Sequence, residues 1–200
     1  MNIKDALTNT LLKARERVLR GLKDPNAGKI LRKNFGDKTV LIDKEAEETI
    51  IGELKNDYEN LVIVSEEAGR LAYGDGSGPI FIIDPLDGST NALRGYPIYS
   101  ISIAVATDYK YSEITAGAVM NVITGDLFIG EKGEGVYLNE RKVCPSHVKY
   151  LKDALIGIDL NIKSKYTDYL TYVKKVMETA KHIRFIGTDA LETAFVAAGI

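Results

Sequence analysis

Apolar residues recur at helical spacing near the N-terminus of the 200-residue chain. A helix over residues 4–22 would place five of them on one face: Leu7, Leu11, Ala14, Val18 and Leu22. Most of the other positions are charged or polar, so we expect an amphipathic helix whose apolar face is part of the core. The sequence GLKDPNAG that follows is typical of a turn.

Three further segments have a helical pattern. One follows Asp43, which we expect to be the N-cap, and its first turn is acidic before an apolar stretch begins. The other two cover residues 165–181 and 188–199.

Runs of β-branched and other apolar residues predict buried strands between these helices. The clearest are LVIVS (61–65) and PIFIID (79–84), separated by a glycine-rich segment, 69–78, that we expect to be a mobile loop. The segments TGDLFIG and GEGVYLN predict hairpins. The remaining predicted strands are 98–106, 114–122, 154–160 and 182–187.

The order of these segments predicts the fold class. A helical start, a sheet-rich middle and alternating strands and helices at the end indicate a layered α+β or α/β architecture. Two hundred residues suffice for one folding unit with two lobes. We expect an N-terminal α+β lobe over residues 1–150 and the start of a C-terminal α/β lobe over residues 151–200.

Charge and composition narrow the range of functions. With 26 Lys and Arg against 28 Asp and Glu, the net charge of -2 provides neither a basic field for nucleic acid nor a cationic face for a membrane. No apolar run approaches the ~18 residues of a membrane span, and no export signal is evident. The single cysteine, Cys144, cannot form an internal disulfide or a thiolate metal cage. We therefore expect a cytoplasmic protein that acts on a small molecule.

Two aspartates stand where a predicted buried strand runs out, in the segment PIFIIDPLDGSTNALRG (79–95). The proline after Asp84 favours extended backbone there, so Asp84 should end the strand. Asp87 should return a second carboxylate to the same side, near the carbonyl of Leu86, and Gly88 leaves room for close backbone approach. Ligands of layered sheets bind at such carboxyl ends, so we expect a binding site here.

The residues that follow predict an anion site beside these acids. Ser-Thr-Asn (89–91) favours the start of a short helix, whose first amides would point outward. A phosphate next to two carboxylates requires a divalent cation between them. Oxygen ligands without histidine or thiolate favour Mg²⁺ over Zn²⁺. The pattern therefore predicts a magnesium and phosphate site.

A second acid pair strengthens this interpretation, because Glu66 and Glu67 directly follow the predicted strand 61–65. That strand end could contribute a further carboxylate to the same site. The alternative is that Asp84 and Asp87 only cap a turn and a helix, which is a common use of such strings.

The motifs VSEEAG (64–69) and FIIDPLDGSTN (81–91) resemble those of the inositol monophosphatase family. This family is part of the Mg²⁺-dependent, lithium-sensitive phosphatase superfamily that includes the fructose-1,6-bisphosphatases. The string DPLDGSTN is highly specific for it, and the similarity extends through 37–47, 117–143 and 185–199. The resemblance implies a layered α/β sandwich of the sugar-phosphatase type, a homodimer, and phosphomonoester hydrolysis by metal-activated water without a covalent phosphoenzyme.

The resemblance also implies roles for the acids. Glu66, Asp84 and the Leu86 carbonyl would hold a first Mg²⁺, and Asp84 with Asp87 would contribute to a second. Two further acids would support the waters around the metals: Asp43 and Glu67.

Other matching positions are implied to bind the substrate. The amides of Gly88 and Ser89 would hold the phosphate, and the Ser89 hydroxyl would help to activate the water. Gly187, Thr188 and Asp189 match the segment that contacts the alcohol part of the substrate. Asp189 departs from the small residue common there, so it either accepts bonds from sugar or inositol hydroxyls or caps a helix.

The sequence departs from the family's pattern at its end. Members continue with a further strand and helix, including a Trp-Asp motif whose aspartate completes the second metal site. This chain contains no tryptophan and stops at Ile200. We therefore expect a truncated chain, or one that has lost a half-site, with a weakly held second metal.

Three functions stay open on this basis. The first is an Mg²⁺-dependent phosphatase acting on inositol monophosphate, fructose 1,6-bisphosphate or both. The second is a catalytically weak or inactive homologue that binds metal and phosphate and has a regulatory or interaction role. The third is an aspartyl-phosphate phosphatase, although that chemistry usually places only one residue between its two aspartates.

Overall fold

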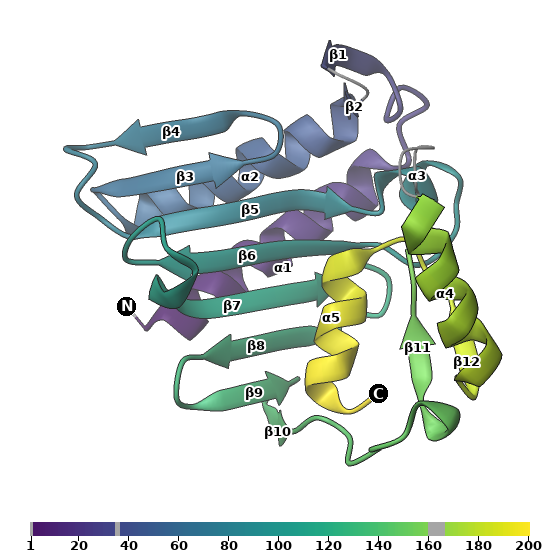
Figure 1. The fold of residues 1–200 in the computed structure, drawn as a ribbon. Coiled ribbons are helices and arrows are strands. Elements are labelled where there is room, and N and C mark those ends of the chain that lie inside the picture. Colours follow the sequence, from purple (N-terminus) through teal and green to yellow (C-terminus); the bar gives the residue numbers. More distant parts are fainter. Residues whose placement is uncertain (1, 35–36, 160–166) are drawn as a thin grey trace.

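The computed structural model describes residues 2–34, 37–159 and 167–200. Its main element is an eight-stranded sheet (Figure 1). The strands, in chain order, are β3 (Leu61–Ser65), β4 (Gly69–Tyr73), β5 (Ile80–Asp87), β6 (Ser100–Ala106), β7 (Ile114–Asn121), β8 (Leu127–Glu131), β9 (Gly135–Leu138) and β10 (Arg141–Val143). Their spatial order is β10-β9-β8-β7-β6-β5-β3-β4. Neighbours are antiparallel except β3 and β5, which are parallel.

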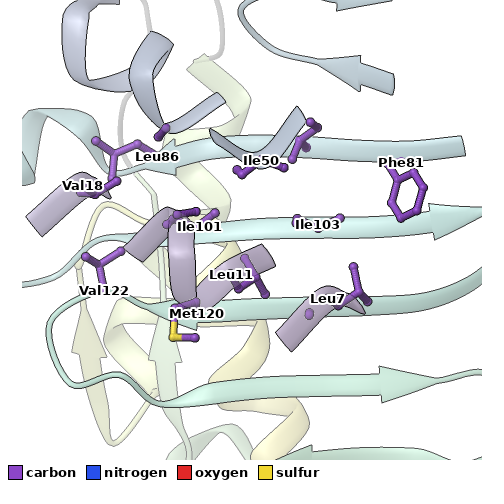
Figure 2. Close-up of a cluster of buried hydrophobic side chains, with 14 of the residues drawn as sticks. Leu7, Leu11, Val18, Ile50, Phe81, Leu86, Ile101, Ile103, Met120 and Val122 are labelled. Carbon is purple, nitrogen blue, oxygen red and sulfur yellow. The ribbon is translucent and has the colours of Figure 1, made fainter. Parts of the chain in front are cut away.

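Two long helices, α1 (Ile3–Gly21) and α2 (Leu41–Asp57), cover one face of the sheet (Figure 1). Alternate strand residues point at these helices, since side chains in a strand alternate between its two faces. Figure 2 shows Leu7 and Leu11 of α1 packed over Ile103 and Met120 of the sheet. Burial of this helix–sheet interface forms the largest hydrophobic core of the described chain.

The opposite face is partly covered by α5 (Asp189–Ala198), which runs across β6, β7 and β9. Leu191 and Ala194 of α5 pack against Phe128 of β8 in a second, smaller core. The molecule is therefore layered, with helices on both faces of a mixed sheet, as the sequence predicted.

Smaller elements flank these layers. Two short strands, β11 (Leu155–Gly157) and β12 (His182–Arg184), form a separate parallel pair beside α4 (Thr167–Thr179). The other small elements are β1 (Ile30–Asn34), β2 (Asp37–Val40), α3 (Ser89–Leu93) and two 3-10 turns, Tyr111–Glu113 and Leu151–Asp153. The β1–β2 hairpin has no counterpart among the predicted elements. No described helix is long and apolar enough to cross a membrane.

Most predicted elements are present with slightly shifted ends. The N-terminal helix and the strands at 61–65, 98–106 and 114–122 are confirmed within about two residues. The strands predicted at 154–160 and 182–187 are shorter, with three residues each, and the last residue of the first lies outside the described residues. The helix predicted at 165–181 is described from Thr167 onward.

Three local predictions were wrong. The segment 69–78 is not simply a loop, because β4 pairs with β3 and turns Leu71 and Tyr73 toward the core. Asp43 is not the N-cap of α2, since the helix begins at Leu41 and Asp43 is its third residue. Asp84 does not end its strand, because β5 continues to Asp87 with an irregular register between the two aspartates.

Candidate active site

The end of β5 carries the two aspartates of the sequence motif. Asp84 is opposite Ser102 of β6, and Asp87 is opposite Ser100, so the irregularity adds one residue between two otherwise regular pairs. The Leu86 side chain is buried in the main core. Its amide donates a hydrogen bond to Asp84 Oδ1 over 3.1 Å, which fixes the Asp84 carboxylate at the surface of the sheet.

The first turn of α2 brings Asp43 to the same region. The backbone amide of Val40 donates to Asp43 Oδ2 over 3.3 Å, which orients the carboxylate at the start of the helix. Asp43 is only 4% exposed, and its Oδ1 has no hydrogen-bond partner among the described residues. An orphaned, buried carboxylate oxygen costs free energy unless something else binds it.

A tight hairpin between β3 and β4 carries Glu66 and Glu67. Its turn consists of residues 66–68, and Gly69 closes it with a φ of 70°, a left-handed conformation that suits glycine. Glu47 of α2 holds both ends of this turn, because its Oε1 accepts bonds from the Ser65 hydroxyl and from the Ala68 amide, the latter at 2.9 Å.

These carboxylates act on one another electrostatically. Burial, together with the charges of Glu67, Asp84 and Glu66, raises the pKa of Asp43 to about 7 against the lowering effect of the Val40 amide. Burial likewise raises the pKa of Asp84 to about 7, with contributions from Asp87, Glu66 and Glu67. The structure thus brings together the five acids that the sequence analysis assigned to one site. They come from three separate segments of the chain: the start of α2, the β3–β4 turn and the end of β5.

The chemistry of this acid cluster, defined as Asp43, Glu66, Glu67, Asp84 and Asp87, fits a hard divalent cation. The donors are all oxygens, and the orphaned Asp43 Oδ1 is a buried acceptor that a cation or its water shell could satisfy. Within the described ranges, no three His, Cys, Asp or Glu side chains are grouped closely enough to hold one metal ion among them. Mg²⁺ usually keeps several waters, through which more widely spaced carboxylates can bind it.

Asp87 has a second connection that the sequence did not reveal. Its Oδ2 accepts a bond from the Thr188 hydroxyl over 2.5 Å and one from the Ala190 amide over 2.8 Å. Ser100, which is fully buried, completes this network through the Thr188 hydroxyl at 2.8 Å. Asp87 therefore caps the N-terminus of α5 from a distant strand.

The turn after Asp87 has the conformation needed for an amide cradle. Gly88 has φ 86° and ψ 32°, and α3 begins immediately afterwards at Ser89. The left-handed backbone of Gly88 favours glycine, and a Cβ there would lie only 3.1 Å from the carbonyl oxygen of Gly187, in a neighbouring segment. Asn91 fixes that segment, since its side-chain amide donates to the carbonyls of Ile98 and Ile186 over 2.8 and 2.7 Å.

A cavity of about 750 Å³ opens in front of this turn. Two segments of the chain line it, the turn after β5 and the start of α5, through Asp87, Gly88, Ser89, Gly187 and Asp189. Thr188 is fully buried behind the wall, where it supports Asp87 instead of facing the cavity. Asp43, Glu66 and Asp84 do not line this cavity; Asp84 lines an adjoining apolar groove along the sheet, together with Asp189.

Asp189 is the first residue of α5 and is exposed. The helix terminus is capped by Asp87, so the alternative that Asp189 is the capping residue is wrong. Burial and the charges of Asp159 and Asp87 raise the pKa of Asp189. Asp189 lines the cavity, and its role in substrate binding stays a prediction.

Sequence reasoning missed two polar residues that organise the site: Glu47 and Ser100. A signal for Glu47 was present, because it follows Asp43 by four residues and therefore lies on the same side of α2. Ser100 gave no comparable signal, since a serine in an apolar strand has no spacing that marks it.

The fold and site together define a class of protein: a layered α/β protein in which the acid cluster lies next to the Gly88 turn at the edge of a cavity. The model of the inositol monophosphatase family matches residues 3–200 of this chain. The chain belongs to that family.

Individual relatives agree with this assignment. The chain is 35% identical over 184 residues to a fructose-1,6-bisphosphatase/inositol-1-monophosphatase of Methanothermobacter thermautotrophicus, covering 87% of this chain and 64% of that protein. It is 30% identical to the Nus factor SuhB of Pseudomonas aeruginosa, over 93% of this chain and 69% of the relative. The crystal structure of the extragenic suppressor protein suhB from Bartonella henselae superimposes with a TM-score of 0.88 at 32% identity, covering 98% and 75% of the two chains.

Proposed function

We propose that this chain belongs to a Mg²⁺-dependent phosphomonoesterase, whose water-mediated hydrolysis takes place at the junction of the acid cluster and the Gly88 turn. The observation that carries the proposal is the buried, unpartnered Asp43 Oδ1 in a cluster of carboxylates beside a glycine turn that lines a cavity. Mutually repelling carboxylates next to such a cavity are explained by a divalent cation.

The residues would divide the work as follows. Glu66, Asp84, Asp87 and the Leu86 carbonyl would hold Mg²⁺, which would supply an activated water and stabilise charge on the leaving alcohol oxygen. The amides of Gly88 and Ser89 would bind the phosphate oxygens, as exposed amides at the start of a turn can. Two further carboxylates would orient the surrounding waters: Asp43 and Glu67.

We propose that the substrate is inositol monophosphate, fructose 1,6-bisphosphate or both. The name of the archaeal relative, which includes both activities, supports this proposal. The cavity provides hydrogen-bond acceptors for a polyol at Asp189 and at the Gly187 segment. We further propose that the protein is a homodimer that acts on a small phosphate ester and binds neither nucleic acid nor a membrane.

A phosphate-release assay tests the function. Inositol monophosphate, fructose 1,6-bisphosphate and a phosphodiester control would be incubated with the purified chain, with Mg²⁺ or with EDTA. We expect release from at least one monoester only in Mg²⁺, and none from the diester. Absence of release from every monoester at millimolar Mg²⁺ would contradict the proposal.

Ser89→Ala is expected to lower kcat about 10²-fold while KM changes little. A hydroxyl that orients the attacking water acts on the chemical step, whereas the amides of the turn continue to hold the phosphate. Steady-state kinetics on the preferred monoester measure both constants. Ser89→Thr keeps a hydroxyl and should recover most of the rate; an unchanged kcat in Ser89→Ala would reduce Ser89 to a helix-starting residue.

A second function has its own support. The name of the relatives called Nus factor SuhB supports a binding protein with a regulatory role. Such a protein would bind Mg²⁺ and phosphate by calorimetry without releasing phosphate from any monoester. Sustained turnover above the rate without protein would exclude it.

A further inference from the structure

We infer that Glu47 is the positioning residue of the acid cluster: it fixes the hairpin turn that carries Glu66 and Glu67 and so sets the affinity for Mg²⁺. This inference rests on the proposed function for the identity of the ion, but its evidence is separate. That evidence is a single buried oxygen that binds the turn at both ends.

Glu47 is in an unusual position for a glutamate. It lies in the seventh position of α2, is only 5% exposed, and points into the protein instead of toward solvent. Glutamates are rarely buried unless their oxygens are bound, and here one oxygen accepts two bonds. Its neighbour Glu48, in contrast, is exposed and pairs with Lys44 across one helical turn at 3.5 Å.

The two bonds are placed where they control the turn. Ser65 is the last residue of β3, and Ala68 immediately precedes β4, so the turn residues 66–68 start and finish at a bond to Glu47. A three-residue turn fixed at both ends has little freedom to rotate as a unit. The backbone positions of Glu66 and Glu67 therefore follow the position of α2.

The same helix also presents Asp43, four residues before Glu47 and on the same side. Through Glu47, α2 thus fixes the positions of Glu66 and Glu67 relative to Asp43. Outer residues that orient metal ligands in this way typically contribute 10–100-fold to metal affinity.

Calorimetric titration with Mg²⁺ at neutral pH tests the inference on four forms of the full chain. In Glu47→Ala we expect the dissociation constant to rise at least tenfold. Glu47→Gln keeps an amide oxygen for both donors, so it should remain within about threefold of the original chain. Glu48→Ala removes a glutamate from the exposed side of α2 and should change nothing.

Two further readouts separate positioning from general destabilisation. Hydrogen exchange at the Ala68 amide should accelerate at least tenfold in Glu47→Ala, while the amides of α5 keep their rates. If the chain turns over, its rate at saturating Mg²⁺ should largely recover in this variant, whereas the Mg²⁺ concentration for half-maximal rate rises. If Glu47→Ala fails to fold, Ser65→Ala removes only one of the two donors and should raise the dissociation constant severalfold.

The outcomes are decisive in either direction. Unchanged Mg²⁺ affinity in a folded Glu47→Ala chain, or in Ser65→Ala where that variant is needed, would overturn the inference, and so would a chain that binds no Mg²⁺ at all. Weakened Mg²⁺ binding without any phosphate release from the original chain would leave Glu47 as the positioning residue and remove the proposed phosphatase function instead.

Discussion

Asp84→Asn is expected to lower Mg²⁺-dependent phosphate release by about 10³-fold or more. Asp84 is assigned to both metal positions, and a bound cation contributes several kcal/mol of transition-state stabilisation, of which each ~1.4 kcal/mol is a tenfold change in rate. The amide side chain has the same shape and still accepts the Leu86 amide bond, so packing is preserved. Steady-state assays at saturating Mg²⁺ measure the loss.

The same substitution should stabilise the protein in EDTA. The pKa of Asp84 is raised to about 7 in the folded chain, above its ordinary value of 3.8, so the folded state disfavours the charged form. Stability associated with the protonated form is complete below pH 4 and is lost as pH rises through 7. We therefore expect Asp84→Asn to raise the free energy of unfolding at pH 8 by up to about 4 kcal/mol, and to leave it nearly unchanged at pH 4.

Thermal denaturation at both pH values, with and without Mg²⁺, checks this second effect. Asp108→Asn removes an exposed aspartate from a surface ion pair and serves as the control, with little expected change at either pH. Equal melting temperatures for Asp84→Asn and the original chain in EDTA at pH 8 would show that Asp84 carries no electrostatic strain.

Asp87→Ala is expected to abolish activity as strongly but to have the opposite effect on stability. The substitution removes a proposed metal ligand and also leaves the Ala190 amide and the buried Thr188 hydroxyl without their shared acceptor. The Thr188 hydroxyl keeps its bond to Ser100, whereas the Ala190 amide loses its acceptor. An unpaired donor costs about 1–3 kcal/mol and a lost hydrogen bond about 1 kcal/mol, so we expect a loss of roughly 2–4 kcal/mol in the free energy of unfolding. Chemical denaturation in EDTA measures this loss without a contribution from metal.

Thr188→Val separates the two roles of Asp87. It removes the hydroxyl bond while keeping the carboxylate and the side-chain shape, so stability should fall by about 1–2 kcal/mol and Mg²⁺ binding should persist. Asp87→Ala with unchanged stability would mean that α5 does not depend on this cap.

The comparison of sequence and structure shows which signals are local. The helix α1 and the strands β3, β6 and β7 were predictable because the apolar pattern of each is continuous. Their apolar side chains meet in one core between the helices and one face of the sheet. The segment around β4 was misjudged because its glycines indicate a turn, whereas pairing with β3 is a long-range effect that a glycine count does not contain.

The site divides in the same way. The acids at 43, 66, 67, 84 and 87 were found because each stands at the end of an apolar run or the start of a helix. The hydrogen bonds that these acids make to distant parts of the chain were not predictable. Asp87, for example, accepts a bond from the Ala190 amide, 103 positions away in the sequence. The assignment of Asp43 as an N-cap failed because an aspartate at the third helical position can orient the preceding amide equally well.

The location of β4 at the edge of the eight-stranded sheet has a consequence for how the family could adjust its metal affinity. An edge strand has one neighbour, so β4 can separate locally from β3 at a lower free energy than β5 or β6 can leave the sheet, since these are paired on both sides. Substitutions along β4 would then change the fraction of time for which Glu66 is correctly placed, without altering any ligand. A natural series of such substitutions could shift the Mg²⁺ concentration that the protein requires while leaving its chemistry intact.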